Sequence, residues 1–191
     1  MVTSQSELSH QVQAAYSQIA RSPAEHGLFP CGRPLAEDLG YPAQVLDSLP
    51  GACVEAFCGV GKVSLDADIR PGEVVLDAGC GAGLDTILAA RRAAKVVGVD
   101  FSLAMLERTQ LCLEEAGLEG QITLLKGEVQ RLPLMEASID VVMVNGLFNL
   151  NPFREEIFLE LARVLRPGGR LYASELVLRE PADLTSAHWF Q

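Results

Sequence analysis

The feature that most constrains the fold is an alternation, from Gly72 onward, of short runs rich in β-branched residues with longer stretches of helical periodicity. Each run is apolar on both faces, which is typical of a strand buried between two layers of helices. Strands separated by helices form βαβ units, and their right-handed crossovers arrange them as a doubly wound sheet. We therefore expect an α/β, Rossmann-like fold with a mostly parallel sheet and helices on both faces. The runs predicted as strands are 73–76 (EVVL), 95–99 (KVVGV), 121–125, 139–144 (IDVVMV) and 170–178, the last after a Pro167-Gly168-Gly169 turn.

The stretches between these runs carry helix signals. We predict one helix over 83–92 and another from Ser102, where apolar residues recur at helical spacing until Gly117 stops the helix. Asn151 and Pro152 have the residue types of an N-cap and a first helical position, so a further helix is expected to open there.

The N-terminal part differs from the rest because Pro and Gly interrupt it repeatedly. We predict a helix over 8–21 and a short one near 43–49, and we interpret 53–72 as a loop that leads into the main fold. The chain is accordingly divided into a helical and irregular lid segment, 1–71, and a ligand-binding unit, 72–191, within one structural domain overall.

Composition excludes several classes of partner. The 191 residues include 15 Lys and Arg against 25 Asp and Glu, a formal charge of −10. Binding to nucleic acid or to an anionic membrane needs clustered basic residues, so neither is expected. No stretch approaches the roughly 20 apolar residues of a transmembrane helix, and the first residues do not resemble a signal peptide. We expect a cytoplasmic protein that binds a neutral or cationic small molecule.

The cysteines give no sign of a disulfide framework or of a metal site. Their number is odd, and neither a CxxC pair nor a Cys/His pair with zinc-site spacing occurs. We therefore expect no metal. The five are Cys31, Cys53, Cys58, Cys80 and Cys112.

The first predicted strand leads into a glycine-rich turn, VLDAGCGAG, with Gly79, Gly81 and Gly83 at alternate positions. Such a turn lets the backbone approach a ligand closely, and the helix behind it offers free N–H groups. In an open parallel sheet, ligands bind beyond the carboxyl ends of the strands, where this turn lies. A dinucleotide fingerprint needs a third glycine three positions after the second, and Leu84 occupies that position.

Two acids indicate which ligand the turn serves. Asp77 precedes the glycines, where its charge would repel a pyrophosphate but suit a cation. Asp100 ends the second predicted strand, 23 positions later, where an acid can accept hydrogen bonds from a ribose diol. The pattern favours a nucleoside that carries positive charge, and S-adenosylmethionine, with its sulfonium and ammonium groups, fits. A nicotinamide-dependent oxidoreductase is disfavoured by Leu84 and Asp77.

Residues 72–178 resemble a class I S-adenosylmethionine-dependent methyltransferase. The motifs VLDAGCGAG, VVGVDFS, LLKGEVQRLP and LRPGGRLY occur in that family's order. The resemblance implies S-adenosylmethionine as cofactor and S-adenosylhomocysteine as product. It also implies the cofactor-binding residues: Asp77, Gly79 and Gly81 along the methionine end with Cys80 and Gly83 in the same turn, Asp100 at the ribose, Phe101 and Met105 beside the adenine, Glu128 and Val129 at its edge, and Asn145 and Gly146 facing the transferred methyl.

A closer resemblance, to arsenite methyltransferases and their bacterial relatives, covers nearly the whole chain. It includes the run 142–177 (VMVNGLFNLNPFREEIFLELARVLRPGGRLYASELV) and N-terminal pieces around Tyr16, Cys31 and 57–63. In that group several cysteine thiolates capture trivalent arsenic, since soft ligands suit a soft centre. The resemblance makes Tyr16, Cys31 and Cys58 the candidate substrate residues.

The match departs from the group at its arsenic-binding cysteines. Gly146 stands where the group has a cysteine after the strand-four asparagine, and Val60 stands at its glycine-flanked cysteine. The last arsenic-binding cysteine would lie beyond Gln191. Only Cys31 and, two residues out of place, Cys58 remain.

The sequence thus predicts an enzyme that methylates a small-molecule acceptor and lacks most arsenic-binding cysteines of its relatives. Two alternatives stay open: a genuine arsenite methyltransferase that uses Cys31 and Cys58, and a non-catalytic nucleoside-binding or regulatory protein. The catalytic residue is unassigned, although Glu175, at the end of the fifth run, can serve as a base if the acceptor needs one.

The family's full fold adds a helix and an antiparallel pair of strands after strand five, and we expect these C-terminal strands to be missing here. Strand five would then be a long apolar edge, which proteins rarely leave bare. Three explanations stay open: the chain is a fragment, it forms a homodimer through this edge, or a partner or another element covers the edge. We predict self-association or poor solubility.

Overall fold

A computed structural model describes residues 5–23, 30–93 and 95–177. Its centre is a five-stranded sheet with the order β3-β2-β1-β4-β5, in which every neighbouring pair is parallel. The predicted parallel sheet is confirmed, and the order reverses between β1 and β4. The strands are β1 (Val74–Ala78), β2 (Lys95–Asp100), β3 (Ile122–Lys126), β4 (Ile139–Asn145) and β5 (Leu165–Ser174).

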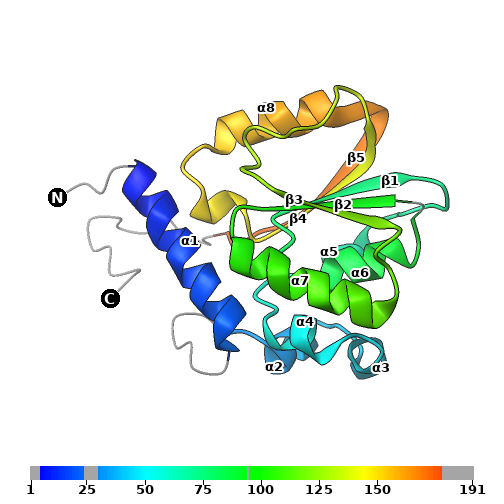
Figure 1. The fold of residues 1–191 in the computed structure, drawn as a ribbon. Helices are drawn as coiled ribbons and strands as arrows, with labels where there is room; N and C mark the ends of the chain where they lie inside the picture. The colour runs from blue at the N-terminus through cyan, green and yellow to red at the C-terminus, as the bar shows by residue number, and fades with distance from the viewer. Residues whose placement is uncertain (1–4, 24–29, 94, 178–191) are drawn as a thin grey trace.

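Helices cover both faces of the sheet, as predicted (Figure 1). The helices α6 (Leu84–Ala90) and α7 (Leu103–Ala116) lie on one face, and α8 (Arg154–Val164) lies on the other. Successive strand residues point to opposite faces, so that Val141 belongs to the core beneath α6 and α7 and Val142 to the core beneath α8. This alternation explains why the strand runs are apolar throughout.

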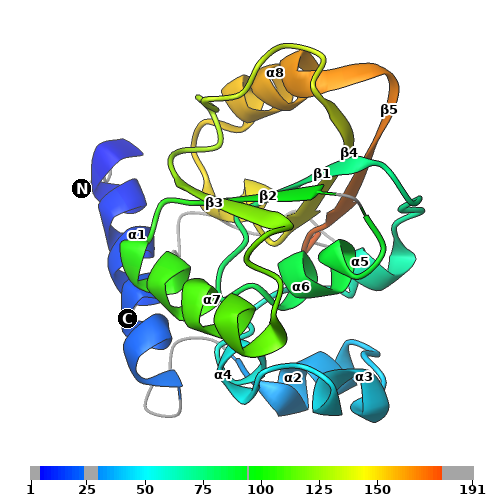
Figure 2. The ribbon, with the colours of Figure 1, turned by 45° about the vertical axis from the view of Figure 1, so that its right-hand side comes forward.

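The N-terminal segment packs on the α7 side of the sheet. Helix α1 (Gln5–Arg21) crosses beside α7, and three of the four short helices in the described N-terminal residues lie beyond α6 and α7 (Figure 2). The helix predicted at 8–21 is confirmed, as is the short one near 43–49, but the loop predicted at 53–72 contains helical turns. The short helices are α2 (Arg33–Asp38), α3 (Ala43–Asp47), α4 (Gly51–Glu55) and α5 (Val63–Asp66).

The predicted limits of α7 are confirmed by its caps. The Ser102 hydroxyl accepts a 3.4 Å hydrogen bond from the Met105 N–H, and Gly117 ends the helix with φ of 65°. The predicted start of α8 is wrong. Phe153 is its N-cap, and Asn151 instead accepts a 2.9 Å hydrogen bond from the Phe153 N–H, which forms a turn just before the helix.

The fifth strand also differs from its prediction. β5 begins at Leu165 and ends at Ser174, so the Pro167-Gly168-Gly169 segment lies within it, at a register shift against β4 between Ile139 and Val141. Residues 178–191, to which the end of the predicted strand belongs, lie outside the described residues. None of the described helices is long and apolar enough to cross a membrane.

Candidate functional site

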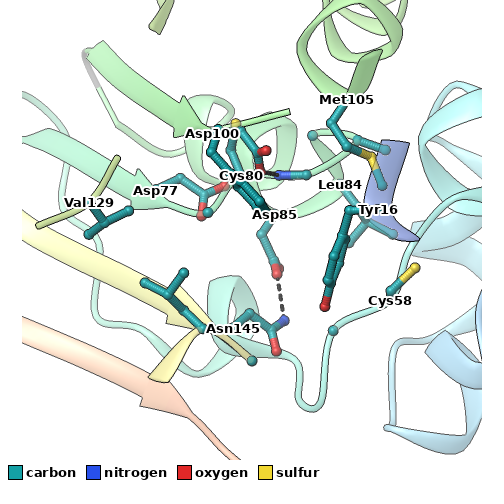
Figure 3. A pocket seen from close by; sticks show the side chains of 18 of the residues that line it. Tyr16, Cys58, Asp77, Cys80, Leu84, Asp85, Asp100, Met105, Val129 and Asn145 are labelled. Atoms are coloured by element: carbon teal, nitrogen blue, oxygen red, sulfur yellow. Dashed lines mark hydrogen bonds between the residues drawn. The ribbon is translucent and has the colours of Figure 1, made fainter. Parts of the chain in front are cut away.

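A pocket opens at the carboxyl ends of β1, β2 and β4, where the strand order reverses (Figure 3). Every predicted site residue except Cys31 lines it. The N-terminal segment adds Val12, Ala56, Phe57 and Gly59, and the sheet side adds Asp85, Gln130, Leu147 and Asn151, none of which the sequence reasoning assigned to the site. The predicted residues in the lining are Tyr16, Cys58, Asp77, Gly79, Cys80, Gly81, Gly83, Asp100, Phe101, Met105, Glu128, Val129, Asn145 and Gly146.

The backbone conformation of the glycine-rich turn requires glycine at three positions. Gly79, Gly81 and Gly83 have φ of 80°, 52° and 89°, a region that other residues rarely adopt. Two side chains hold the turn by its backbone. Asp100 accepts a 2.9 Å hydrogen bond from the Gly81 N–H, and Thr109 on α7 donates a 2.7 Å hydrogen bond to the Gly81 carbonyl.

Asp100 is the last residue of β2, lines the pocket and is 5% exposed. Its second carboxylate oxygen accepts a 2.8 Å hydrogen bond from the Ser102 N–H. Burial raises the pKa of Asp100 to about 6, against the effect of backbone hydrogen bonds from Ser102, Gly81 and Phe101. The carboxylate is therefore held in place at the pocket wall.

Asp77, at the carboxyl end of β1, is 2% exposed and accepts a 2.6 Å hydrogen bond from the Thr86 hydroxyl. Burial raises the pKa of Asp77 to about 7, and the nearby negative charge of Asp85 adds to the rise, whereas the Thr86 hydroxyl opposes it. Ionised Asp77 is thus poorly compensated by the protein itself.

Asp85 is a charged residue of the pocket lining that sequence reasoning missed. It lies in the first turn of α6, whose residues are all buried, and is 6% exposed. Burial raises the pKa of Asp85, although hydrogen bonds from Ser64, Tyr41 and Asn145 favour the ionised form. The available signal was an acid within a helix that is apolar apart from Asp85 and Thr86, because a buried charge needs partners elsewhere in the fold.

Three buried carboxylates therefore face one pocket, those of Asp77, Asp85 and Asp100. Within the described ranges, no Lys, Arg or His lines the same pocket. Charges of one sign at low dielectric repel one another and attract an opposite charge strongly. The pocket accordingly suits a ligand with positive charge and disfavours a pyrophosphate.

One side of the pocket can hold a flat apolar ring. Met105 and Val129 are almost fully buried, while the Phe101 ring meets Tyr16 edge-on with centroids 6.4 Å apart. Glu128 is held at the rim, where its carboxylate accepts a 2.8 Å hydrogen bond from the Gln130 side chain. These residues come from the segments after β2 and β3, from α7 and from α1.

The two candidate thiols are neighbours, although Cys31 does not line the pocket. The pKa of Cys58 rises to about 12, chiefly because it is buried and also because its thiol contacts that of Cys31. The Cys31 thiol also donates a 3.4 Å hydrogen bond to the Pro23 carbonyl. Tyr16 lies beside Cys58 in Figure 3, and burial raises the pKa of its hydroxyl.

Glu175, which the sequence offered as a possible base, does not line the pocket. Its carboxylate accepts hydrogen bonds of 2.6 Å and 2.7 Å from the Leu147 and Phe148 N–H groups, so it caps the turn after β4. Asn145 is also bonded to the protein, through an amide whose two ends contact residues 60, 61 and 85. Both side chains hold the pocket wall.

Comparisons with known proteins agree with this geometry. Residues 76–173, more than half of the chain, match the family model described as a methyltransferase domain. The chain is 37% identical to the arsenite methyltransferase of Halobacterium salinarum over 76% of its own length, and spans 38% of that protein.

Two solved structures share the fold. One is a phosphoethanolamine N-methyltransferase of Haemonchus contortus, solved with phosphoethanolamine and S-adenosylhomocysteine, with a TM-score of 0.65, 20% identity, and coverage of 92% of this chain and 33% of that one. The other is the [4+2]-cyclase SpnF, with a TM-score of 0.68, 23% identity, and coverage of 91% and 62%. The segment matched by the family model holds the glycine turn and Asp100, and the chain belongs to the class I S-adenosylmethionine-dependent methyltransferases.

Proposed function

We propose that this chain binds S-adenosylmethionine in the pocket and methylates a small-molecule acceptor. The observation that carries the proposal is the set of buried carboxylates around a glycine turn, with no basic side chain among the described lining residues. When bound, the cofactor supplies a methyl group on a sulfonium sulfur, which passes to the acceptor by in-line displacement and leaves S-adenosylhomocysteine.

The residues present fit this cofactor. Asp77, near the methionine end, would neutralise positive charge, and Asp100 would accept hydrogen bonds from the ribose hydroxyls. Met105 and Val129 would enclose the adenine, with Glu128 at its edge. The role of these side chains is to bind and orient, because methyl transfer between aligned groups gains most from alignment and exclusion of water.

We also propose that the segment 1–71 acts as a lid on the unit 72–191. Val12 and Tyr16 of α1, with Phe57 and Cys58 after α4, line the pocket together with the glycine turn. Apolar side chains in these positions would keep water from the methyl group.

Calorimetric titration with S-adenosylhomocysteine tests cofactor binding, and single-turnover transfer of a labelled methyl group to a panel of small acceptors tests catalysis. Binding together with transfer to one acceptor class supports the whole proposal. Absence of binding contradicts it.

A trivalent arsenical is a second candidate acceptor, favoured by the contact between the Cys58 and Cys31 thiols at the pocket. Two thiolates can hold a soft centre beside the cofactor, although relatives use more. Methylation of arsenite that is lost in both Cys31→Ser and Cys58→Ser would support this candidate.

A non-catalytic nucleoside-binding protein is the rival from another class. Gly146 motivates it, because a glycine replaces a residue that relatives use on the substrate. Cofactor binding without transfer to any acceptor, arsenite included, would favour this rival.

Self-association through β5 is the proposed partner interaction. Among the described strands, β5 pairs with β4 alone, and Leu171, Leu176 and Val177 are exposed near this edge. Light scattering that shows a stable monomer at high concentration would contradict it.

A further inference from the structure

The buried carboxylate of Asp85 accepts hydrogen bonds from three other residues, Tyr41, Ser64 and Asn145. One of its oxygens accepts a 2.5 Å hydrogen bond from the Tyr41 hydroxyl and further hydrogen bonds from the Ser64 hydroxyl and N–H. The other oxygen accepts a 2.9 Å hydrogen bond from the Asn145 amide, across the pocket floor (Figure 3). Every one of these donors comes from outside α6, so the carboxylate joins four parts of the chain.

The Asn145 amide that is bonded to Asp85 is also hydrogen-bonded to the backbone of the segment Cys58–Gly61, which we call the rim loop. The Asn145 oxygen accepts hydrogen bonds of 2.8 Å and 3.1 Å from the Val60 and Gly61 N–H groups. Its nitrogen donates a 2.8 Å hydrogen bond to the Gly61 carbonyl, besides the one to Asp85. A flipped amide would set its oxygen against the Gly61 carbonyl and the Asp85 carboxylate, so Asp85 adds a second acceptor that favours the orientation able to hold the rim loop.

The rim loop is also seated by close packing. A Cβ on Gly59 would lie 2.5 Å from the Asn145 amide nitrogen, and one on Gly61 would lie 2.4 Å from the Ser174 hydroxyl oxygen. Real Cβ contacts are essentially never so short, so the packing of the rim loop against Asn145 and Ser174 requires glycine at both positions. The loop therefore lies directly on the carboxyl ends of β4 and β5.

We propose that Asp85 is a positioning residue: by orienting Asn145 it fixes the rim loop, and with it Cys58 and Val60, over the part of the pocket next to Gly146. Val60 is the nearest neighbour there, 3.5 Å from where a Gly146 Cβ would be. The placement of the loop needs no cofactor. Only its consequence, a fall in kcat when the loop shifts, rests on the proposed function.

Labelling of Cys58 by iodoacetamide, followed peptide by peptide in the full chain without cofactor, reports on the loop. In the seated loop the thiol is half-buried, its pKa is raised, and it donates a hydrogen bond to the Ala56 carbonyl, all of which slow alkylation. Asp85→Asn keeps the size of the side chain but breaks the pattern of donors. We expect Cys58 labelling to accelerate about tenfold in Asp85→Asn and in Asn145→Ala.

The double variant Asp85→Asn/Asn145→Ala should label no faster than Asn145→Ala alone, because Asp85 acts through Asn145. Gly59→Ala leaves Asp85 unchanged but places a methyl group against the Asn145 amide, so it should displace the rim loop and also expose Cys58. The matched control is Asp66→Asn, an exposed acid on α5 paired with Lys62, which should label at the wild-type rate.

Two results would overturn the proposal. One is an unchanged Cys58 rate in Asp85→Asn and Asn145→Ala. The other is parallel labelling of the buried Cys53, Cys80 and Cys112, which would mean that the whole fold loosens and that Asp85 is structural only. If the wild-type protein does not bind S-adenosylhomocysteine, the proposed function is contradicted, but the labelling result still tests the role of Asp85.

Discussion

The hydroxyl of Thr86 donates a 2.6 Å hydrogen bond to the carboxylate of Asp77, and both side chains are buried, at 0% and 2% exposure. This one hydrogen bond does not offset the burial of a charge beside Asp85, which is why the pKa of Asp77 rises to about 7. An ionised group kept at such a cost to stability is typical of a binding site, where the ligand supplies the missing opposite charge.

The first prediction concerns stability and pH. Between the usual pKa of 3.8 and the raised value of about 7, the folded protein binds more protons at Asp77 than the unfolded chain does, so the free energy of unfolding falls as pH rises through this window. Asp77→Asn removes this fall and should stabilise the protein at pH 8 by up to about 4 kcal/mol, at roughly 1.4 kcal/mol per pKa unit. Urea unfolding at pH 5 and pH 8 measures it.

The same substitution should weaken binding of S-adenosylmethionine, because the cationic ligand loses its counter-charge. Calorimetry on the same samples checks this. A variant that is destabilised at pH 8, or that binds the cofactor as well as the wild-type protein, would contradict the role given to Asp77.

The second prediction concerns Asp100, which is proposed to bind the ribose. Asp100→Ala should weaken S-adenosylhomocysteine binding by roughly 1–3 kcal/mol, the scale of polar groups left without a partner. Asp140→Ala is a matched control. Asp140 also accepts a hydrogen bond from a backbone N–H, that of Val74, at 2.8 Å, but at the opposite end of the sheet. Equal losses of affinity in the two variants would argue against the ribose site.

Elements with local signals could be predicted from the sequence. Helix α7 begins after Ser102 and ends before Gly117 because both caps act within a few residues of the helix. Asp77 and Asp100 could be placed together because parallel strands bring their carboxyl ends to one edge of a sheet.

What depends on distant contacts could not be predicted. The partners of Asp85 lie 21, 44 and 60 positions away, at Ser64, Tyr41 and Asn145, so no local pattern marks them. The short helices α4 and α5 are too brief to form alone and owe their stability to packing against the core.

The third prediction concerns Arg108, which ties the N-terminal segment to α7. Its guanidinium donates hydrogen bonds of 2.6 Å and 2.9 Å to the Ala52 and Ala20 carbonyls and 2.9 Å to the Glu55 carboxylate. Arg108→Met should lower the free energy of unfolding by roughly 1–3 kcal/mol because the two carbonyls lose a charged donor. Hydrogen exchange should accelerate first in α1 and α4.

Lysine at position 108 should not restore stability, since only the planar guanidinium reaches three acceptors at once. Arg33→Met is the control. Arg33 is paired with Glu37 and Asp47 at the exposed surface, so its loss should cost at most about 1 kcal/mol. Equal costs for the two arginines would show that Arg108 does not join the segments.

The fourth prediction tests the contact between the glycine turn and α7. Gly83 has φ of 89°, and a Cβ there would lie 2.5 Å from the Thr109 methyl carbon. Gly83→Ala should therefore push away Thr109, the donor to the Gly81 carbonyl, and lower the free energy of unfolding by about 1–3 kcal/mol. It should also weaken S-adenosylhomocysteine binding. Thr109→Ser keeps the hydroxyl and removes the methyl group, so it should be nearly neutral alone and should recover part of the loss when combined with Gly83→Ala. If the double variant shows no recovery in either denaturant unfolding or calorimetry, the collision is not the cause, and the strained backbone of residue 83 accounts for the whole effect.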